Sequence, residues 1–249
     1  MLQFLGIIPA RYGSTRFPGK PLAPLGDKTV IQWVYDQSHK VLDEVYVATD
    51  DKRIFDHVTA FGGNVIMTSA EHLSGTDRCR EAMDSVIAGT GFDPDVIINI
   101  QGDEPFIQPD QIHKLMQCFE DKDTDIATLV KQIHEEDEIF DENKVKVVLD
   151  SRNFALYFSR SPVPFIRGRQ QSDWINSHSF YRHMGIYAYR KNVLRSITGL
   201  GISDLEAAES LEQLRWLENG YRIKTSETDF DSPGIDTPAD LEKARKLMG

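Results

Sequence analysis

Short apolar runs rich in β-branched residues alternate along this 249-residue chain with segments of helical periodicity. Runs that are apolar throughout are typical of parallel strands buried on both faces. Strands that alternate with helices predict an α/β fold with a doubly wound, Rossmann-like, mostly parallel sheet. The five expected strands are Phe4–Pro9, Val45–Thr49, Val96–Ile100, Ile126–Val130 and Val145–Leu149.

The helical segments carry boundary signals of their own. Residues 109–120 place apolar side chains at helical spacing. Ser203 followed by Glu206 matches a capping box and predicts a helix start, and Gly220 is placed to end that helix. Thr237, followed directly by a proline, predicts the start of the last helix.

The second half of the chain is less regular. Residues 154–189 contain two prolines, a basic cluster and a polar run, which indicate an inserted β-rich arm or loop. No repeat and no clear linker divides the chain. We therefore expect one domain over residues 1–249, with an insertion at about 154–189.

Charge and composition exclude several classes of protein. The net charge of -11 argues against a nucleic-acid partner, because phosphate backbones select clustered Lys and Arg. No apolar stretch approaches the roughly 20 residues that span a bilayer, so no membrane partner is expected. The start of the chain lacks signal-peptide features, and Cys79 and Cys118 fit reduced, buried thiols better than a disulfide. These features predict a cytoplasmic protein.

The loop after the first expected strand is the first candidate binding site. Arg11, Arg16 and Lys20 place three cations within ten residues, and Gly13 and Ser14 allow close backbone approach and add donors. Such a loop at the carboxyl edge of a sheet suits a polyphosphate, although a solvated basic turn is the alternative. The loop matches neither the Walker A pattern nor the GxGxxG pattern.

Two carboxylates stand where a hard cation can be held. Asp103 follows the expected strand Val96–Ile100, and Asp236 precedes the last helix. Carboxylates from distant positions can converge on Mg²⁺, which prefers oxygen ligands. The alternative for Asp236 is an ordinary turn residue at a helix entry.

Nine segments follow one another along the chain: IPARYGSTRFPGKPL, VATDD, SGTDR, NIQGDEP, VKVVLD, ALYFSRSPVP, RHMGIYAYR, SLEQLRWLENG and GIDTPADLEKAR. Together they resemble the 3-deoxy-D-manno-octulosonate cytidylyltransferases. Loops similar to the first occur in the sialate cytidylyltransferases, but the later segments match the octulosonate family.

The resemblance implies a nucleotide site, a metal site and a sugar site. Its implied catalytic residues are Lys20, Arg11, Asp103 and Asp236, with Asp103 and Asp236 as ligands of Mg²⁺ and a second Mg²⁺ brought by CTP. The implied nucleotide-binding residues are Arg11, Gly13, Ser14, Arg16, Lys20, Ser74, Thr76, Arg78 and Gln101. The implied sugar-binding residues are Arg160, His183, Tyr187, Glu212 and Gln213.

Each sugar-side residue also has an ordinary structural interpretation. His183 can be a satisfied interior histidine, and Tyr187 can be a core aromatic. Glu212 and Gln213 are adjacent on a helix, so their side chains point about 100° apart. The resemblance further implies a homodimer, with residues 165–181 of the insertion as the candidate interface.

The implied reaction is transfer of CMP from CTP to the anomeric hydroxyl of an acidic octulosonate, with release of pyrophosphate, for lipopolysaccharide biosynthesis. The alternatives are the same chemistry on 8-amino octulosonate or sialate, and a non-catalytic nucleotide-sensing module on the same fold. A dehydrogenase is disfavoured because the GxGxxG pattern is missing.

Overall fold

The computed structural model describes residues 2–248, which fold into two compact units. The first unit contains the chain up to residue 113, residues 190–198 and the chain from residue 231. The second contains residues 114–189 and 199–230. The expected insertion at 154–189 lies in the second unit, and the single-domain division stays a prediction.

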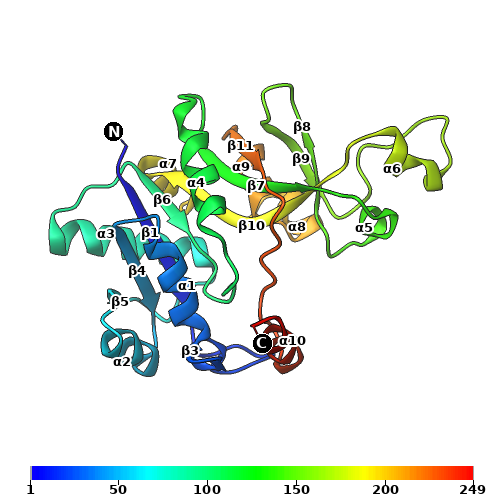
Figure 1. The fold of residues 1–249 in the computed structure, drawn as a ribbon. Coiled ribbons are helices and arrows are strands. Elements are labelled where there is room, and N and C mark those ends of the chain that lie inside the picture. The colour runs from blue at the N-terminus through cyan, green and yellow to red at the C-terminus, as the bar shows by residue number, and fades with distance from the viewer. Residues whose placement is uncertain (1, 249) are drawn as a thin grey trace. The chain divides into compact units, whose positions relative to one another are not determined.

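The first unit is built on four parallel strands in the order β6-β1-β4-β5 (Figure 1). Every residue of β6 is buried, as is most of β1, which agrees with the fully apolar runs in the sequence. The strands are β1 (Phe4–Ala10), β4 (Glu44–Thr49), β5 (Val65–Met67) and β6 (Val96–Asn99).

The strand order places a switch point between β1 and β6. The helices α1 (Val30–His39) and α2 (Lys52–Ala60) follow β1 and β4 and carry the chain outward to β5. The helix α3 (Gly75–Thr90) then returns it to β6 on the other side of β1. Because parallel crossovers are right-handed, this reversal puts α3 on the opposite face, and ligands bind at such reversals.

Smaller elements complete the first unit. A 3₁₀ helix, η1 (Lys20–Leu22), leads into the hairpin β2 (Pro24–Leu25) and β3 (Lys28–Thr29). The helices α7 (Lys191–Ile197) and α10 (Pro238–Met248) follow later in the chain, and α4 (Pro109–Gln117) begins in the first unit and ends in the second. Thr237 caps α10 as expected, since its hydroxyl accepts the amide of Asp240 at 3.2 Å and the Asp240 carboxylate accepts the Thr237 amide at 3.0 Å.

The second unit has a mixed sheet in which β7 pairs in parallel with β11 and antiparallel with β10. Its strands are β7 (Ile126–Gln132), β8 (Lys146–Leu149), β9 (Ala155–Ser159), β10 (Tyr181–Arg190) and β11 (Ile223–Glu227). Its helices are η2 (Cys118–Glu120), α5 (Glu136–Phe140), η3 (Gln171–Asp173), α6 (Trp174–Ser177), α8 (Asp204–Glu209) and α9 (Glu212–Glu218).

The α/β fold class with a mostly parallel sheet and an added β-rich segment is confirmed, with two corrections. The run at Val145–Leu149 forms β8, which pairs only antiparallel, with β9 and β10. A tight turn with Asn153 at φ 60° reverses the chain after β8 and makes it a hairpin strand. The predicted single helix from Ser203 to Gly220 is wrong, because Ser210 adopts φ 52° and divides it into α8 and α9.

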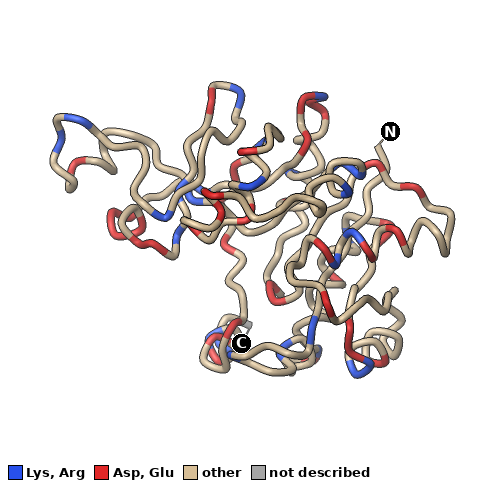
Figure 2. The backbone as a smooth tube through the Cα atoms, turned by 180° about the vertical axis from the view of Figure 1, so that it is seen from behind, with Lys and Arg blue, Asp and Glu red and all other residues tan. Residues whose placement is uncertain are grey.

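Charged residues of both signs are distributed along the described backbone (Figure 2). Cys79 and Cys118 are buried free thiols, as expected. Within residues 2–248, no helix combines the length and the apolar character that crossing a membrane requires.

Candidate active site

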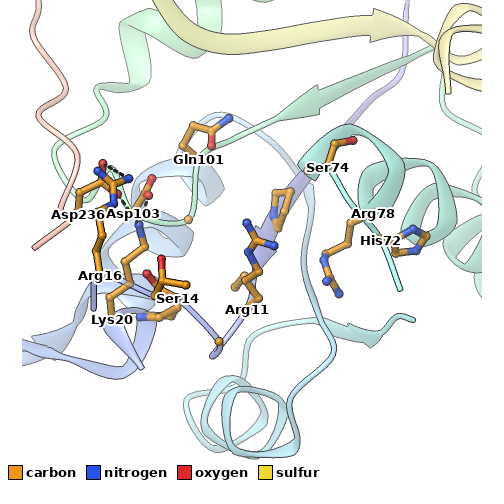
Figure 3. A pocket seen from close by; sticks show the side chains of 17 residues that line it. Arg11, Ser14, Arg16, Lys20, His72, Ser74, Arg78, Gln101, Asp103 and Asp236 are labelled. Carbon is orange, nitrogen blue, oxygen red and sulfur yellow. Dashed lines mark hydrogen bonds and ion pairs between the residues drawn. The ribbon is translucent and has the colours of Figure 1, made fainter. Parts of the chain in front are cut away.

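A cavity of about 450 Å³ opens at the carboxyl ends of β1 and β6, at the switch point of the first unit. The loops after β1 and β6, the start of α3 and the segment before α10 form its wall (Figure 3). Its lining residues are Pro9, Ala10, Arg11, Gly13, Ser14, Thr15, Arg16, Lys20, Pro21, His72, Ser74, Gly75, Arg78, Gln101, Gly102, Asp103 and Asp236.

The loop after β1 is folded around Tyr12. The Tyr12 carbonyl accepts the amides of Ser14 and Gly19, each at 2.9 Å. Gly19 has φ 75°, and a Cβ there would lie 2.9 Å from the Tyr12 ring. The Arg53 guanidinium packs over the Tyr12 ring, with its central carbon 3.2 Å from the ring centroid. Gly19 therefore lets the chain turn into η1 and places Lys20 in the cavity.

The loop after β6 approaches β1 too closely for any side chain at Gly102. A Cβ on Gly102 would lie 2.6 Å from the carbonyl oxygen of Pro9. The next residue, Asp103, accepts the amide of Ile235 on its backbone carbonyl at 2.8 Å. That bond, with the burial of Ile235 in an apolar cluster, brings Asp236 to Asp103 from far along the chain.

Lys20 joins the two predicted metal ligands. Its ammonium group bonds to the Asp103 carboxylate and donates to Asp236 Oδ1 at 3.0 Å. Burial alone lowers the pKa of Lys20, but the charge and hydrogen bonds of Asp103 and Asp236 raise it above its ordinary value. Arg16 contacts the second oxygen of Asp236 at 3.0 Å. Figure 3 shows these four side chains gathered at one end of the cavity.

The carboxylates of Asp103 and Asp236 fit a divalent cation. They already converge on one positive charge, the ammonium of Lys20. Within residues 2–248, no cluster of three or more His, Cys, Asp or Glu side chains is placed to hold a metal. Two carboxylates with the remaining positions left to substrate oxygens and water are typical of Mg²⁺.

Glu104 adds no ligand to this pair. Burial raises the pKa of Glu104 to about 8, and the charge of Asp103 adds to the shift. At neutral pH the Glu104 carboxyl is therefore mostly protonated, which limits the negative charge beside Asp103.

The other end of the cavity is formed by the start of α3. Ser74 caps α3, and its hydroxyl accepts the amide of Asp77 at 3.1 Å. Arg78 is 3% exposed and is held by Thr68 at 2.5 Å and by Asp50 at 3.0 Å. The helix terminus and the fixed guanidinium give this end a positive character suited to an anionic ligand.

Sequence reasoning missed His72, which lines the cavity two residues before Ser74 and bonds to the carboxylate of Glu81. It also missed Asp50, which orients Arg78. Both belong to quoted or adjacent motifs, since Asp50 lies in VATDD and His72 directly precedes Leu-Ser-Gly-Thr-Asp-Arg. Contact with the cavity identifies His72, and the ion pair with Arg78 identifies Asp50.

The predicted nucleotide-binding residues are gathered on the cavity wall, with one exception. Arg11, Gly13, Ser14, Arg16, Lys20, Ser74, Arg78 and Gln101 line it. Thr76 is buried in the first turn of α3 and is not part of the wall. Arg11 lies between the two ends of the cavity in Figure 3, and no ion pair ties it to another residue of the described chain.

The predicted sugar-binding residues lie in the second unit, and His183 is the best defined of them. The Thr128 hydroxyl directs its single proton to the carbonyls of Met184 and Ile186, whose oxygens lie 3.0 and 2.7 Å from its own. The Thr128 oxygen lies 3.0 Å from His183 Nε2, so this network assigns the proton to Nε2. Burial lowers the pKa of His183 to about 3. The imidazole is therefore neutral, with Nδ1 as an acceptor.

Tyr187 follows His183 on β10 after a bulge between Met184 and Tyr187, and the two rings lie 5.1 Å apart. Burial raises the pKa of Tyr187 well above its ordinary value, so the phenol stays protonated. Its hydroxyl is buried and has no hydrogen-bond partner among the described residues. The Tyr187 ring packs edge-on against Trp216 of α9 at 5.0 Å.

Glu212 and Gln213 occupy the first turn of α9. Arg215 holds Glu212 by a bond of 2.8 Å, and the side chain of Gln213 is buried. The break between α8 and α9 therefore places both residues at a helix start, whereas the sequence predicted them inside one long helix.

Arg160 follows β9 and is engaged mainly by backbone carbonyls. Its Nε donates to Glu209 O at 2.7 Å, and its terminal nitrogens donate to Glu142 O at 3.0 Å and Ser210 O at 3.4 Å. Of its five N–H groups, two remain for another acceptor. The guanidinium thus holds the turn between α8 and α9.

Comparisons with known proteins agree on one family. A sequence model described as cytidylyltransferase matches residues 5–224. A 3-deoxy-manno-octulosonate cytidylyltransferase of Parabacteroides distasonis is 58% identical, over 100% of this chain and 99% of that protein. An 8-amino-3,8-dideoxy-manno-octulosonate cytidylyltransferase of Shewanella halifaxensis is 48% identical, over 94% of each.

Among solved structures, CMP:2-keto-3-deoxy-manno-octonic acid synthetase complexed with CTP matches with a TM-score of 0.90 and 45% identity, over 99% of this chain and 98% of that chain. The full-length identity, the fold and the family match agree with one another. This chain belongs to the 3-deoxy-manno-octulosonate cytidylyltransferase family.

Proposed function

We propose that this protein transfers CMP from CTP to the anomeric hydroxyl of 3-deoxy-D-manno-octulosonate. The observation that carries the proposal is the cavity at the switch point, where Lys20 joins Asp103 and Asp236 beside the cations of the loop after β1. Full-length relatives that bear the octulosonate name support the choice of sugar.

In the proposed reaction the sugar oxygen attacks the α-phosphorus of CTP. The new P–O bond forms as the bond from that phosphorus to the bridging oxygen breaks, and pyrophosphate leaves with the electron pair. The hydroxyl proton passes to water. Lys20, Arg11 and Arg16 supply positive charge for the transferring group and the leaving group, and no protein nucleophile is needed.

We propose that Asp103 and Asp236 hold one Mg²⁺ and that CTP brings a second. Bound Mg²⁺ lowers the pKa of an attacking hydroxyl and neutralises phosphate charge. The chain contributes two carboxylates that converge on one cation, with a lysine between them. A metal ligand and a phosphate-binding lysine at one point also explain how a protein of net charge -11 can bind two anionic substrates.

On the sugar side, we propose that His183 Nδ1 accepts a hydrogen bond from a sugar hydroxyl and that Tyr187 donates a hydrogen bond from its buried hydroxyl. Glu212 and Gln213 are proposed to bind further hydroxyls. Arg160 keeps two N–H groups that are proposed to bind the sugar carboxylate.

The sugar with an amine at carbon 8 is a second candidate, because a relative 48% identical to this chain bears that name. The two sugars differ at one position, where a carboxylate or carbonyl would favour the amine. Relative kcat/KM for the two sugars decides between them.

We also propose that the protein is a cytoplasmic homodimer that supplies lipopolysaccharide biosynthesis. Phe165 is 72% exposed although it packs on Trp174, and Leu156 is 60% exposed. Phe165 lies in the segment at 165–181 and Leu156 lies on β9, and exposed apolar side chains of this kind suit a subunit interface. Molar mass by light scattering, for the wild type and Phe165→Asp, tests the dimer.

The function is tested by measuring pyrophosphate release with CTP and each of three sugars: the octulosonate, its 8-amino analogue and sialate. The proposal expects turnover with CTP and the octulosonate, dependent on Mg²⁺. Binding of CTP without turnover on any sugar would favour a nucleotide-sensing module.

A further inference from the structure

The turn between α8 and α9 has an unusual backbone. Ser210 has φ 52° and ψ 48°, the left-handed region that favours glycine. Ser210 is followed by Leu211 and then by Glu212 and Gln213. A non-glycine residue stays in this region when surrounding contacts hold it there. The contacts at Ser210 therefore help to position the side chains of Glu212 and Gln213 at the start of α9.

Arg160 holds the turn from outside. It donates to the carbonyls of Glu209 and Ser210, which are the last residue of α8 and the left-handed residue itself. A carbonyl at a helix end lacks its intrahelical partner, so a guanidinium is a suitable donor. The side chain that carries the proposed carboxylate contact is thus fixed to the turn that carries the proposed hydroxyl contacts.

The carboxylate of Glu209, at the end of α8, binds back to the end of β9. Its Oε1 accepts the hydroxyl of Ser159 at 2.6 Å, and its Oε2 accepts the backbone amide of Arg160 at 2.9 Å. Burial and the nearby Glu209 also raise the pKa of Tyr157. Both oxygens of Glu209 therefore bind the end of β9, from which Arg160 projects.

We propose that Glu209 is a positioning residue for the sugar acceptor. Through its bonds to Ser159 and Arg160, Glu209 sets the position of the start of α9 relative to the end of β9. That position fixes the distance between the Arg160 guanidinium and the side chains of Glu212 and Gln213. Glu209 itself binds no substrate. The inference rests on the proposed function, because it takes these three residues as sugar ligands.

Substitution of Ser210 disturbs the same turn without removing Glu209. Ser210→Val places a β-branched side chain at φ 52°, where it is strained, whereas Ser210→Gly accepts that geometry. Asn153→Val is the matched control, because Asn153 is the other non-glycine residue with positive φ within residues 2–248. It lies in the turn between β8 and β9 and carries no proposed ligand.

The test measures KM for the sugar, KM for CTP and kcat for these variants and for Glu209→Ala and Glu209→Gln. We expect Glu209→Ala and Ser210→Val to raise the sugar KM by about tenfold or more, the effect of losing a charged hydrogen bond, with the CTP KM unchanged. Glu209→Gln, which keeps one acceptor, and Ser210→Gly should raise it less. Asn153→Val should lower thermal stability without changing the sugar KM.

Titration of the octulosonate into each folded protein by calorimetry gives a readout independent of turnover. If Glu209→Ala and Ser210→Val had the same sugar KM and the same sugar affinity as the control Asn153→Val, the positioning role would be overturned. A loss of CTP affinity equal to the loss of sugar affinity would overturn it as well. If Glu209→Ala does not fold, Glu209→Gln and Ser210→Val decide the outcome. A wild type inactive on the octulosonate contradicts the proposed function instead, and the ratios are then measured with the sugar it uses.

Discussion

Gly102→Ala tests how the two loops of the cavity are brought together. The added Cβ would lie 2.6 Å from the Pro9 carbonyl oxygen, whereas ordinary contacts begin near 3.4 Å, so the backbone must separate by about 0.8 Å. The strand side resists this shift, because Pro9 is paired with Ala48 in the parallel sheet. The shift therefore falls on the loop that carries Asp103.

The expected cost has two parts. Forcing an extra methyl group into a packed site typically costs about 1–3 kcal/mol of the free energy of unfolding. Displacing a catalytic carboxylate by about 1 Å can cost roughly 100-fold in rate. We expect Gly102→Ala to lose stability in urea unfolding within that range and to lose about two orders of magnitude in kcat by pyrophosphate release.

The control is Gly89→Ala in α3, where no heavy atom lies within 4 Å of the added Cβ. An exposed helical glycine replaced by alanine should be neutral or stabilising by up to about 1 kcal/mol. Wild-type stability and turnover in Gly102→Ala would refute the close approach of Gly102 to the end of β1.

Three further results are expected. Lys20→Ala should lower kcat more than it raises the CTP KM, since Lys20 acts on the transferring group; a change in KM alone, by steady-state kinetics, would make it a binding residue only. Arg160→Ala should raise the sugar KM strongly and spare the CTP KM, and equal losses for both substrates would refute a separate sugar site. The pKa of His183 is about 3 in the folded protein, below the value near 6.5 expected in the unfolded chain. Only the unfolded state binds the proton between these values, so the free energy of unfolding should decrease as the pH is lowered from about 6.5 to about 3, by at most about 1.4 kcal/mol per pH unit. His183→Gln should flatten this fall in urea unfolding at pH 4–7, and an unchanged slope would show that His183 is not buried neutral.

The part of the site that follows a strand could be predicted from the sequence. The loop after β1 and the loop after β6 each follow an apolar run that predicts a buried strand. The cations, glycines and carboxylate of these loops therefore lie at the carboxyl ends of the two strands. The close approach at Gly102 could not be read from the sequence, because it joins the end of β1 to a loop about ninety positions further along the chain. A fold with parallel strands determines that such loops meet, but not at what distance.

The break at Ser210 could not be predicted. Local signals there favour a continuous helix, with a capping box at Ser203 and helix formers on both sides of Ser210. The left-handed turn is held by Arg160, fifty residues earlier, and a distant contact of this kind leaves no local pattern. The antiparallel pairing of β8 was missed for a similar reason, since an apolar run does not reveal the direction of its neighbours.

The most direct test of the account is pyrophosphate release from CTP and the octulosonate by the wild type, Asp103→Asn and Asp236→Asn, with and without Mg²⁺, alongside detection of the CMP-sugar. We expect one CMP-sugar per pyrophosphate for the wild type with Mg²⁺. We expect almost no turnover in the folded variants or after removal of the metal, because each change removes a charged ligand or the cation itself. Near-normal turnover in either variant at saturating Mg²⁺, or in the wild type after chelation, would contradict it.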